Sequence, residues 1–263
     1  MAAKVWAIST NKGGVLKTSL TTNLAGVLSK KGRVLIVDMD NQSNVLVSFG
    51  KNPDVLETSI YDVLVQGEDP KKAIINVYEN IDVLPSNDDM AFFELDVLTE
   101  REKYPKPFFL LKDAIEPLKS QYDYILIDSP PNMGLTTGSI LTAANGVLIP
   151  FQPESYSMRS LLKIIQSIED FKSKHNPSLS ILGVVATLVD TRTIVHTQVL
   201  QECRKFCHER GIRLFDTVIP RSVRFASNVA FERLPSTLAD PKHSVVSCYF
   251  DLGKEINGNG QKK

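Results

Sequence analysis

Short apolar runs alternate with longer stretches of helical length through most of the chain. Seven runs have the length of a strand: residues 5–9, 34–37, 81–84, 124–127, 146–149, 181–189 and 214–219. Apolar residues fill these runs almost without interruption, so both faces of each strand are expected to be covered. The stretches between them predict helices over residues 18–31, 108–120, 134–144, 155–175 and 195–210. The pattern therefore predicts an α/β fold with a doubly wound, mostly parallel sheet and helices on both faces.

Residues 50–110 follow this pattern less regularly, and short helices are expected over 56–65 and 90–99. No internal repeat or low-complexity linker divides the chain. Residues 1–252 are therefore predicted to form one domain. The polar, glycine-rich residues 253–263 are predicted to form a disordered tail.

The strongest chemical signal is the segment that follows the first predicted strand. Residues 11–19 read Asn-Lys-Gly-Gly-Val-Leu-Lys-Thr-Ser and lead directly into the first predicted helix. Unpaired backbone N–H groups at a helix N-terminus, together with the helix dipole, favour a phosphate group. Glycines allow the backbone to wrap around the anion, while Lys17 can reach the terminal phosphates and Thr18 can ligate Mg²⁺. The segment therefore predicts a phosphate-binding loop formed by Lys12, Gly13, Gly14, Val15, Leu16, Lys17, Thr18 and Ser19.

Three aspartates follow two other predicted strands. Asp38 and Asp40 follow residues 34–37, and Asp128 follows residues 124–127. A carboxylate at the end of such a strand can hold a Mg²⁺ ion directly or through water. Each aspartate alone is compatible with a simple turn or capping role. Their recurrence at strand ends, together with the loop, favours a nucleotide site.

Taken together, these segments resemble the deviant Walker A ATPases, the group that contains the ParA-type partition proteins and the MinD-type division regulators. The family pattern is Lys-Gly-Gly-x-Gly-Lys-Thr, and this chain has Leu16 where the family has its last glycine. The resemblance implies that Lys12 reaches the nucleotide of a partner subunit and that Lys17 acts within its own chain. It also implies that Asp40 orients the attacking water, that Thr18, Asp38 and Asp128 serve the metal, and that the backbone around Pro220 and Arg221 meets the adenine.

The same resemblance suggests a DNA-binding surface. In ParA-type relatives, basic residues that follow the last two strands contact the DNA backbone without sequence preference. Carried over, the candidates are Arg192, Arg221 and Arg224, and Lys205, Arg233 and Lys242 could widen the patch. The guanidinium group of an arginine can donate two parallel hydrogen bonds to a phosphate group. The affinity of such contacts for DNA falls steeply as the salt concentration rises. Scattered arginines on a solvated surface are the alternative interpretation.

Composition narrows the possibilities further. The 30 Lys and Arg residues balance 30 Asp and Glu residues, so DNA binding would depend on a local basic face. No apolar run reaches the roughly 18 residues that span a bilayer. The first strand begins too early to leave room for a signal peptide, which favours a cytoplasmic location. The resemblance to ParA-type proteins implies that the protein is associated with the nucleoid there. Cys203 and Cys207 lack the further ligands of a zinc or iron–sulfur spacing, so we interpret them as ordinary helix residues.

These observations favour a DNA-segregation ATPase that uses ATP and Mg²⁺. Because the loop motif begins at residue 11, the short ParA form is expected, without a helix-turn-helix ahead of the ATPase. The resemblance implies an ATP-dependent homodimer that binds non-specific DNA, and a centromere-binding adaptor protein that stimulates hydrolysis. One alternative is a nucleotide-locked, hydrolysis-poor interaction module, which Leu16 motivates. Another is a MinD-like membrane regulator, which residues 245–252 disfavour because they hold almost no basic residues.

Overall fold

A central eight-stranded sheet organises the computed structural model, which describes residues 3–258. The strand order is β3-β4-β2-β5-β1-β6-β7-β8. Only β3 and β4 pair in antiparallel fashion, and every other neighbouring pair is parallel. The strands are β1 (Lys4–Ile8), β2 (Val34–Asp38), β3 (Ile75–Tyr78), β4 (Ile81–Leu84), β5 (Tyr124–Asp128), β6 (Gly146–Phe151), β7 (Ser180–Val189) and β8 (Leu214–Pro220).

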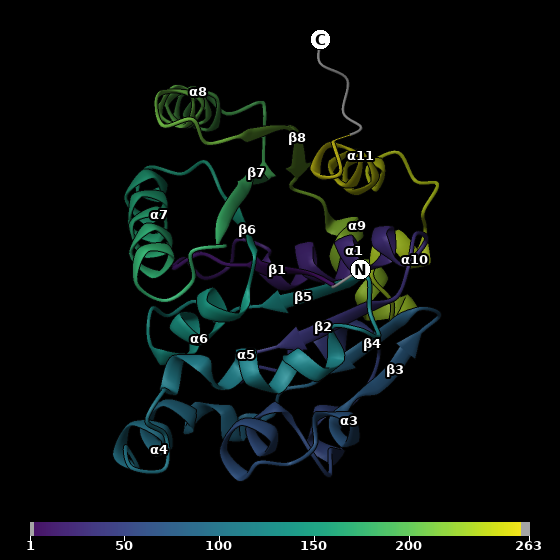
Figure 1. The fold of residues 1–263 in the computed structure, drawn as a ribbon. Helices are drawn as coiled ribbons and strands as arrows, with labels where there is room; N and C mark the ends of the chain where they lie inside the picture. Colours follow the sequence, from purple (N-terminus) through teal and green to yellow (C-terminus); the bar gives the residue numbers. More distant parts are fainter. Residues whose placement is uncertain (1–2, 259–263) are drawn as a thin grey trace.

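Helices cover both faces of this sheet (Figure 1). They are α1 (Lys17–Leu28), α2 (Asn44–Ser48), α3 (Pro70–Ala73), α4 (Phe93–Thr99), α5 (Leu110–Ile115), α6 (Leu135–Ala143), α7 (Ser157–Lys174), α8 (Ile194–Glu209), α9 (Val223–Ser227), α10 (Ser236–Ala239) and α11 (Ser247–Ile256). The prediction of a doubly wound α/β fold is confirmed.

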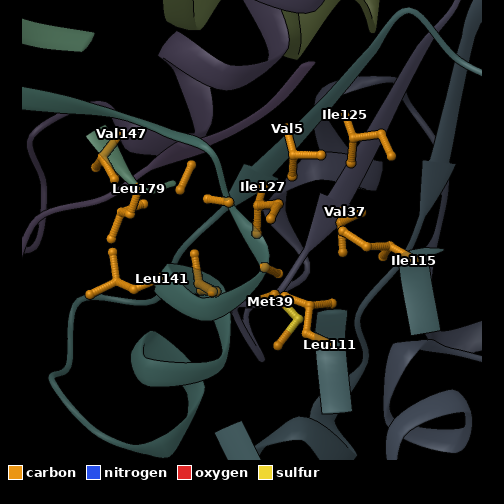
Figure 2. Packing of buried hydrophobic residues seen from close by; sticks show 14 of the residues in the cluster. Val5, Val37, Met39, Leu111, Ile115, Ile125, Ile127, Leu141, Val147 and Leu179 are labelled. Atoms are coloured by element: carbon orange, nitrogen blue, oxygen red, sulfur yellow. The ribbon is translucent and has the colours of Figure 1, made fainter. Parts of the chain in front are cut away.

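Two hydrophobic cores lie on opposite faces of the sheet. Along β1, Val5 and Ala7 enter one core, whereas Trp6 and Ile8 enter the other, because successive side chains of a strand point to opposite faces. Figure 2 shows the first core, where strand residues pack against Leu111, Ile115 and Leu141 of α5 and α6. The second core packs the sheet against α1 and α11. Burial on both faces explains why the strands lack polar alternation.

Strand β3 departs from the sequence prediction, which contained no strand at residues 75–78. Its residues alternate between half-buried and exposed, as expected at the edge of a sheet. Strand β3, the antiparallel partner of β4, therefore has no continuous apolar run in the sequence of the kind that marks the other strands.

The predicted helix at 108–120 is also shorter than expected. Helix α5 covers Leu110–Ile115 and is flanked by 3₁₀ turns at Pro107–Phe109 and Glu116–Leu118. Pro117 lacks an N–H group and clashes with the preceding helical turn, which explains why the regular helix ends there.

The C-terminal segment corrects the predicted tail. Helix α11 runs to Ile256, so the prediction of disorder from Gly253 is wrong for Gly253–Ile256. Glu255 accepts hydrogen bonds from the backbone N–H groups of Asp216 and Thr217, at 3.1 and 2.9 Å, and from the Thr217 hydroxyl. These bonds attach α11 to the edge strand β8. Residues 259–263 of the predicted tail lie outside the described part of the chain.

The apolar face of α11 is used for packing inside the molecule. Tyr249 and Leu252 are fully buried against α1 and β8. Between residues 3 and 258, no helix combines the length and the apolar character needed to cross a bilayer.

The attachment of α11 gives a first prediction. Glu255→Ala should lower the free energy of unfolding by about 1–3 kcal/mol, because the N–H of half-buried Thr217 and that of exposed Asp216 would both lose their charged acceptor. Chemical denaturation measures this loss. The control is Lys254→Ala on the same helix, whose exposed ammonium pairs only with Asp251 and should change stability by less than about 0.5 kcal/mol. Equal effects of the two substitutions would contradict the role assigned to Glu255.

Candidate nucleotide-binding site

The loop between β1 and α1 has the backbone of an anion-binding loop. Gly14 and Leu16 both lie in the left-handed region, with φ of 71° and 67°, and Lys17 begins α1 directly afterwards. The first N–H groups of a helix have no acceptor within the helix. They therefore face the loop, where the positive end of the helix dipole adds to their attraction for a negative group.

Leu16 stands where the family pattern has its last glycine, and its backbone adopts left-handed torsions that a glycine adopts readily. Its φ and ψ are 67° and 31°, a conformation that costs a residue with a Cβ about 1–2 kcal/mol. The leucine side chain is half-buried and packs against the second core, which offsets part of this cost. Leu16 therefore preserves a left-handed loop instead of replacing it with another conformation.

Lys17 places a charged amine inside this loop. The residue is 8% exposed, and its Nζ donates to the carbonyl oxygen of Lys12 at 3.1 Å. Burial lowers the pKa of Lys17, although the nearby carboxylates of Asp128 and Asp40 oppose this effect. No carboxylate in the described residues forms a direct ion pair with this amine. Its positive form would thus gain free energy from a bound anion.

Asp128 connects the helix to the sheet. It ends β5 in register with Ile8 of β1 and Asp38 of β2. Its two oxygens accept hydrogen bonds from the hydroxyls of Thr18 and Thr21, at 2.5 and 2.9 Å. Burial raises the pKa of Asp128 to about 6, against the opposing effect of these two hydroxyl donors and of Lys17. Sheet pairing thus brings Asp128 and Thr18 together, as the sequence predicted.

Asp38 and Asp40 form the second carboxylate segment. Asp38 is buried and accepts from the backbone N–H groups of Asp40 and Val45, both at 3.1 Å. Burial and the negative charge of Asp128 raise the pKa of Asp38 well above its usual range. Asp40 is half-buried and accepts from the N–H of Gln42 at 3.1 Å. Asp38 therefore fixes the loop after β2, and this loop presents Asp40.

A hollow of about 380 Å³ lies over these segments. It is lined by Gly13, Gly14, Leu16, Lys17, Thr18, Ser19, Thr22, Asn23, Asp40, Asn44, Val47, Ser48, Pro131 and Val229. Most of the predicted loop thus borders one space. Val15 is instead buried, and its carbonyl oxygen accepts from Thr187 at 3.1 Å. Pro220 ends β8 and Arg221 follows it, both outside this lining, so the predicted adenine contact stays a prediction.

Lys12 points to a different partner. Its Nζ lies 2.6 Å from Oε2 of Glu154 and 3.1 Å from Oγ of Ser157, both beyond the end of β6. The Lys12 amine is the main cause that lowers the pKa of Glu154. In the single chain, the lysine that was predicted to reach a second subunit is therefore held by its own subunit.

The three candidate DNA-binding arginines also lie beyond the strand ends. The N–H of Arg221 donates to Val189 at 3.1 Å, which joins the loops after β7 and β8. Arg192 is exposed and binds both carboxylate oxygens of Asp190, at 2.9 and 2.8 Å. Arg224 pairs with Asp240 at 2.5 Å. Two of the three candidates therefore already have an anionic partner.

Several residues of the site escaped the sequence analysis. Thr21 was recognisable in principle, because it lies one helical turn after Thr18 on the same face of α1. Glu154 contacts Lys12 across 142 positions, and no local pattern marks such a pair. The helix α2 residues of the hollow, Asn44, Val47 and Ser48, belong to a helix too short to be periodic.

The two helix cysteines lie next to each other inside the molecule. Cys203 and Cys207 are buried on α8 with their sulfur atoms 4.0 Å apart. Across residues 3–258, no group of three His, Cys, Asp or Glu side chains is placed to hold a metal ion without other ligands.

Comparisons with known proteins agree with this geometry. Residues 3–181 match a family model described as an AAA domain. The chain is 36% identical to the sporulation initiation inhibitor protein Soj of Bacillus subtilis, over 98% of this chain and 99% of that protein. It is 34% identical to the chromosome partitioning protein ParA of Caulobacter vibrioides, over 96% of this chain and 93% of that protein.

Two solved structures extend the comparison. A putative plasmid partition protein from Borrelia burgdorferi bound to AMPPNP has a TM-score of 0.80 and 26% identity, covering 98% of this chain and all of that chain. Cobyrinic acid a,c-diamide synthase from Mycobacterium smegmatis, with a bound ATP analog and magnesium, has a TM-score of 0.85 and 28% identity. The match covers 99% of this chain and 96% of that chain. The fold and loop define a P-loop protein. The chain belongs to the ParA-type family of the MinD/ParA ATPase superfamily.

The conformation of Leu16 gives a second prediction. Leu16→Val should lower the free energy of unfolding by about 1–2 kcal/mol, because a β-branched residue tolerates left-handed torsions poorly. Leu16→Gly should stay within about 1 kcal/mol of the parent, because relief of strain offsets the lost packing and the greater freedom of glycine. Denaturation measures both variants. A valine variant as stable as the parent would contradict the strained geometry.

Proposed function

We propose that the hollow beside Lys17 binds ATP with Mg²⁺. The observation that carries this proposal is the buried amine of Lys17, which has a carbonyl but no carboxylate as its direct partner in the described structure. It lies beside the N-terminus of α1, and both features favour the same kind of ligand, a phosphate group. The nucleotides in the two related structures support this assignment.

The residues present also fit a magnesium ion. Asp38 and Asp128 are buried with raised pKa values, so a cation nearby would offset their repulsion. We assign the ion to the hydroxyl of Thr18 and, directly or through water, to the carboxylates of Asp128 and Asp38. When bound, Mg²⁺ neutralises charge on the phosphate oxygens. Lys17 and the loop N–H groups hold the phosphates in place.

Hydrolysis is the further step that we assign to this site. Asp40 borders the hollow and is more exposed than Asp38, so water can reach its carboxylate. It orients the attacking water for displacement at the terminal phosphate. The family membership of the chain supports this role for Asp40.

At the level of the cell, we assign the chain to DNA segregation, as the names of its relatives suggest. ATP closes a homodimer that binds non-specific DNA of the nucleoid, and a centromere-binding adaptor protein stimulates hydrolysis and release. Lys12 must leave Glu154 before it can reach the nucleotide of a second subunit. Arg192 and Arg224 must likewise exchange their carboxylate partners for DNA phosphates.

The left-handed Leu16 motivates a second candidate, a module that binds ATP but hydrolyses it poorly. The observed torsions are those that a glycine adopts readily, so the loop keeps its concave backbone. This conformation favours the competent ATPase over the inactive module. A membrane-bound regulator has less support, because α11 already packs its apolar face against α1 and β8.

The decisive test is ATP binding by Lys17→Ala. This change should weaken the affinity for ATP–Mg²⁺ by about 10- to 100-fold, because charged hydrogen bonds to phosphate are lost. The control is Lys31→Ala, which removes an exposed lysine just beyond α1 and should leave the affinity unchanged. Calorimetric titration measures both variants. If Lys17→Ala binds ATP as tightly as the parent protein does, the proposed site is wrong.

DNA binding is tested with Arg221→Ala combined with Arg224→Ala. The double variant should bind random duplex DNA more weakly, and the slope of log affinity against log salt should fall by about 1–2. The measurement is fluorescence anisotropy with no nucleotide, ADP or ATP–Mg²⁺. The control for loss of two exposed arginines is Arg204→Ala combined with Arg210→Ala, one on α8 and the other directly after it. DNA binding that does not depend on ATP would contradict the proposal that the ATP-bound dimer binds DNA. Equal DNA affinities of the two double variants would contradict the role assigned to Arg221 and Arg224.

A further inference from the structure

A row of exposed apolar residues lies on and before helix α4. Phe92, Leu95 and Leu98 are 56%, 62% and 46% exposed. They are spaced three residues apart, so they follow one side of the helix. The opposite side, with Phe93 and Val97, enters the first core. We call Phe92, Leu95 and Leu98 the α4 stripe. A row of large apolar side chains in water is typical of a surface that binds a partner.

The charge around the α4 stripe has one sign along the helix. Residues 88–100 contain five carboxylates and no lysine or arginine. Glu100 pairs with Lys103, whereas Asp96, Glu94 and Asp89 accept hydrogen bonds from the Tyr61 hydroxyl, the N–H of Thr136 and the side-chain amide of Asn87. Asp88 and Asp89 are exposed at the N-terminal end, and no ion pair is described for either. Glu100 is thus the one carboxylate of this segment with an ion pair in the described structure. The other four leave the segment negative, and two of them, Asp88 and Asp89, are adjacent at its N-terminal end.

A hollow adjoins this acidic end. It measures about 380 Å³ and is lined by Gln42, Ser43, Pro53, Asp54, Leu56, Asn87, Asp88 and Asp89. Its carboxylate and amide oxygens can accept hydrogen bonds from the N–H groups of a guanidinium or ammonium group. The hollow and the stripe share the segment around residues 88–92. One bound segment could therefore fill the hollow with a basic side chain and lay apolar side chains along the stripe.

We propose that the α4 stripe and the adjoining acidic hollow bind a cationic amphipathic segment of a partner protein. Charge complementarity selects this occupant over an acidic or purely apolar one. The binding would follow the familiar arrangement in which apolar positions at helical spacing dock on an apolar surface. The identification of the partner as the adaptor protein rests on the proposed function. The chemistry of the surface does not depend on it.

The surface is connected to two of the segments that border the nucleotide hollow. Gln42 and Ser43 line the acidic hollow two and three residues after Asp40, whose carboxylate and carbonyl oxygens accept their N–H groups at 3.1 and 3.0 Å. On α4 itself, Glu94 accepts from the N–H of Thr136 at 3.1 Å, near the start of α6. That helix follows the loop that carries Pro131. Figure 1 shows α4 at the periphery, on the side of the sheet where α5 and α6 lie.

The test uses the full chain and a fluorescent synthetic peptide of about four helical turns, with leucine and arginine at amphipathic spacing. A scrambled peptide and one with glutamate in place of arginine are the comparison probes. The amphipathic cationic peptide should bind most tightly in an anisotropy titration. Leu95→Ser combined with Leu98→Ser should weaken it about 10-fold, since both apolar contacts are lost. Asp88→Asn combined with Asp89→Asn should weaken it and flatten its salt dependence.

Matched controls isolate the surface. Leu162→Ser removes an apolar residue of α7 that is 45% exposed, and Glu169→Gln with Asp170→Asn removes two adjacent exposed carboxylates there. Neither control should change peptide binding. Because all of these side chains are exposed or carry no core contacts, the variants should unfold at the parent temperature. Equal binding of the three peptides, or equal effects of the α4 and α7 variants, would overturn the proposal.

Two further measurements separate the possible failures. If the α4 variants alter the sedimentation mass of the protein alone, the stripe joins two copies of this chain and the proposal is wrong. ATP affinity is titrated on the same variants and should match the parent, because no substituted residue lines the nucleotide hollow. A parent protein that binds the peptide but no ATP would refute the proposed function while supporting the surface.

Discussion

The pairing of β5 with β1 and β2 is the constraint on which the site depends. It sets Asp128 level with Ile8 and Asp38, at the edge where the phosphate loop begins. Thr18 and Thr21 then bind the two oxygens of Asp128, which fixes the rotation of α1 about its axis. That rotation directs Lys17 and the first N–H groups of the helix into the hollow. The position of the candidate phosphate-binding loop thus follows from the register of a sheet.

The same pairing concentrates unfavourable charge. Asp38 and Asp128 are both buried, and each resists ionisation in a dry environment. Lys17 lies close enough to offset part of this cost, yet it has a carbonyl as its hydrogen-bond partner. A protein that only needed to be stable would be better served by apolar residues at these positions. The buried charges are therefore best explained by a charged ligand that completes the site.

Sequence reasoning succeeded where local pattern determines structure. Continuous apolar runs located seven of the eight strands, and the loop motif located Lys17, Thr18 and the start of α1. Strand β3 escaped because its half-exposed residues carry no such run. Glu154 and Glu255 escaped because their partners, Lys12 and Thr217, are distant in sequence. The sequence also does not show which of the candidate arginines form ion pairs with carboxylates of the same chain, as Arg192 does with Asp190.

The ion pair between Lys12 and Glu154 has a consequence for the response of the protein to ionic strength. Both side chains are partly exposed, so dissolved salt screens their attraction. Any anion that recruits Lys12 must first displace Glu154, and salt weakens the attraction of Lys12 for either of these partners. Contacts between arginines and a polyanion become weaker under the same change. The lysine and the arginines therefore respond to salt in the same direction, because each exchanges a carboxylate of its own chain for an outside anion. Low ionic strength favours these exchanges most when the outside anion carries several charges.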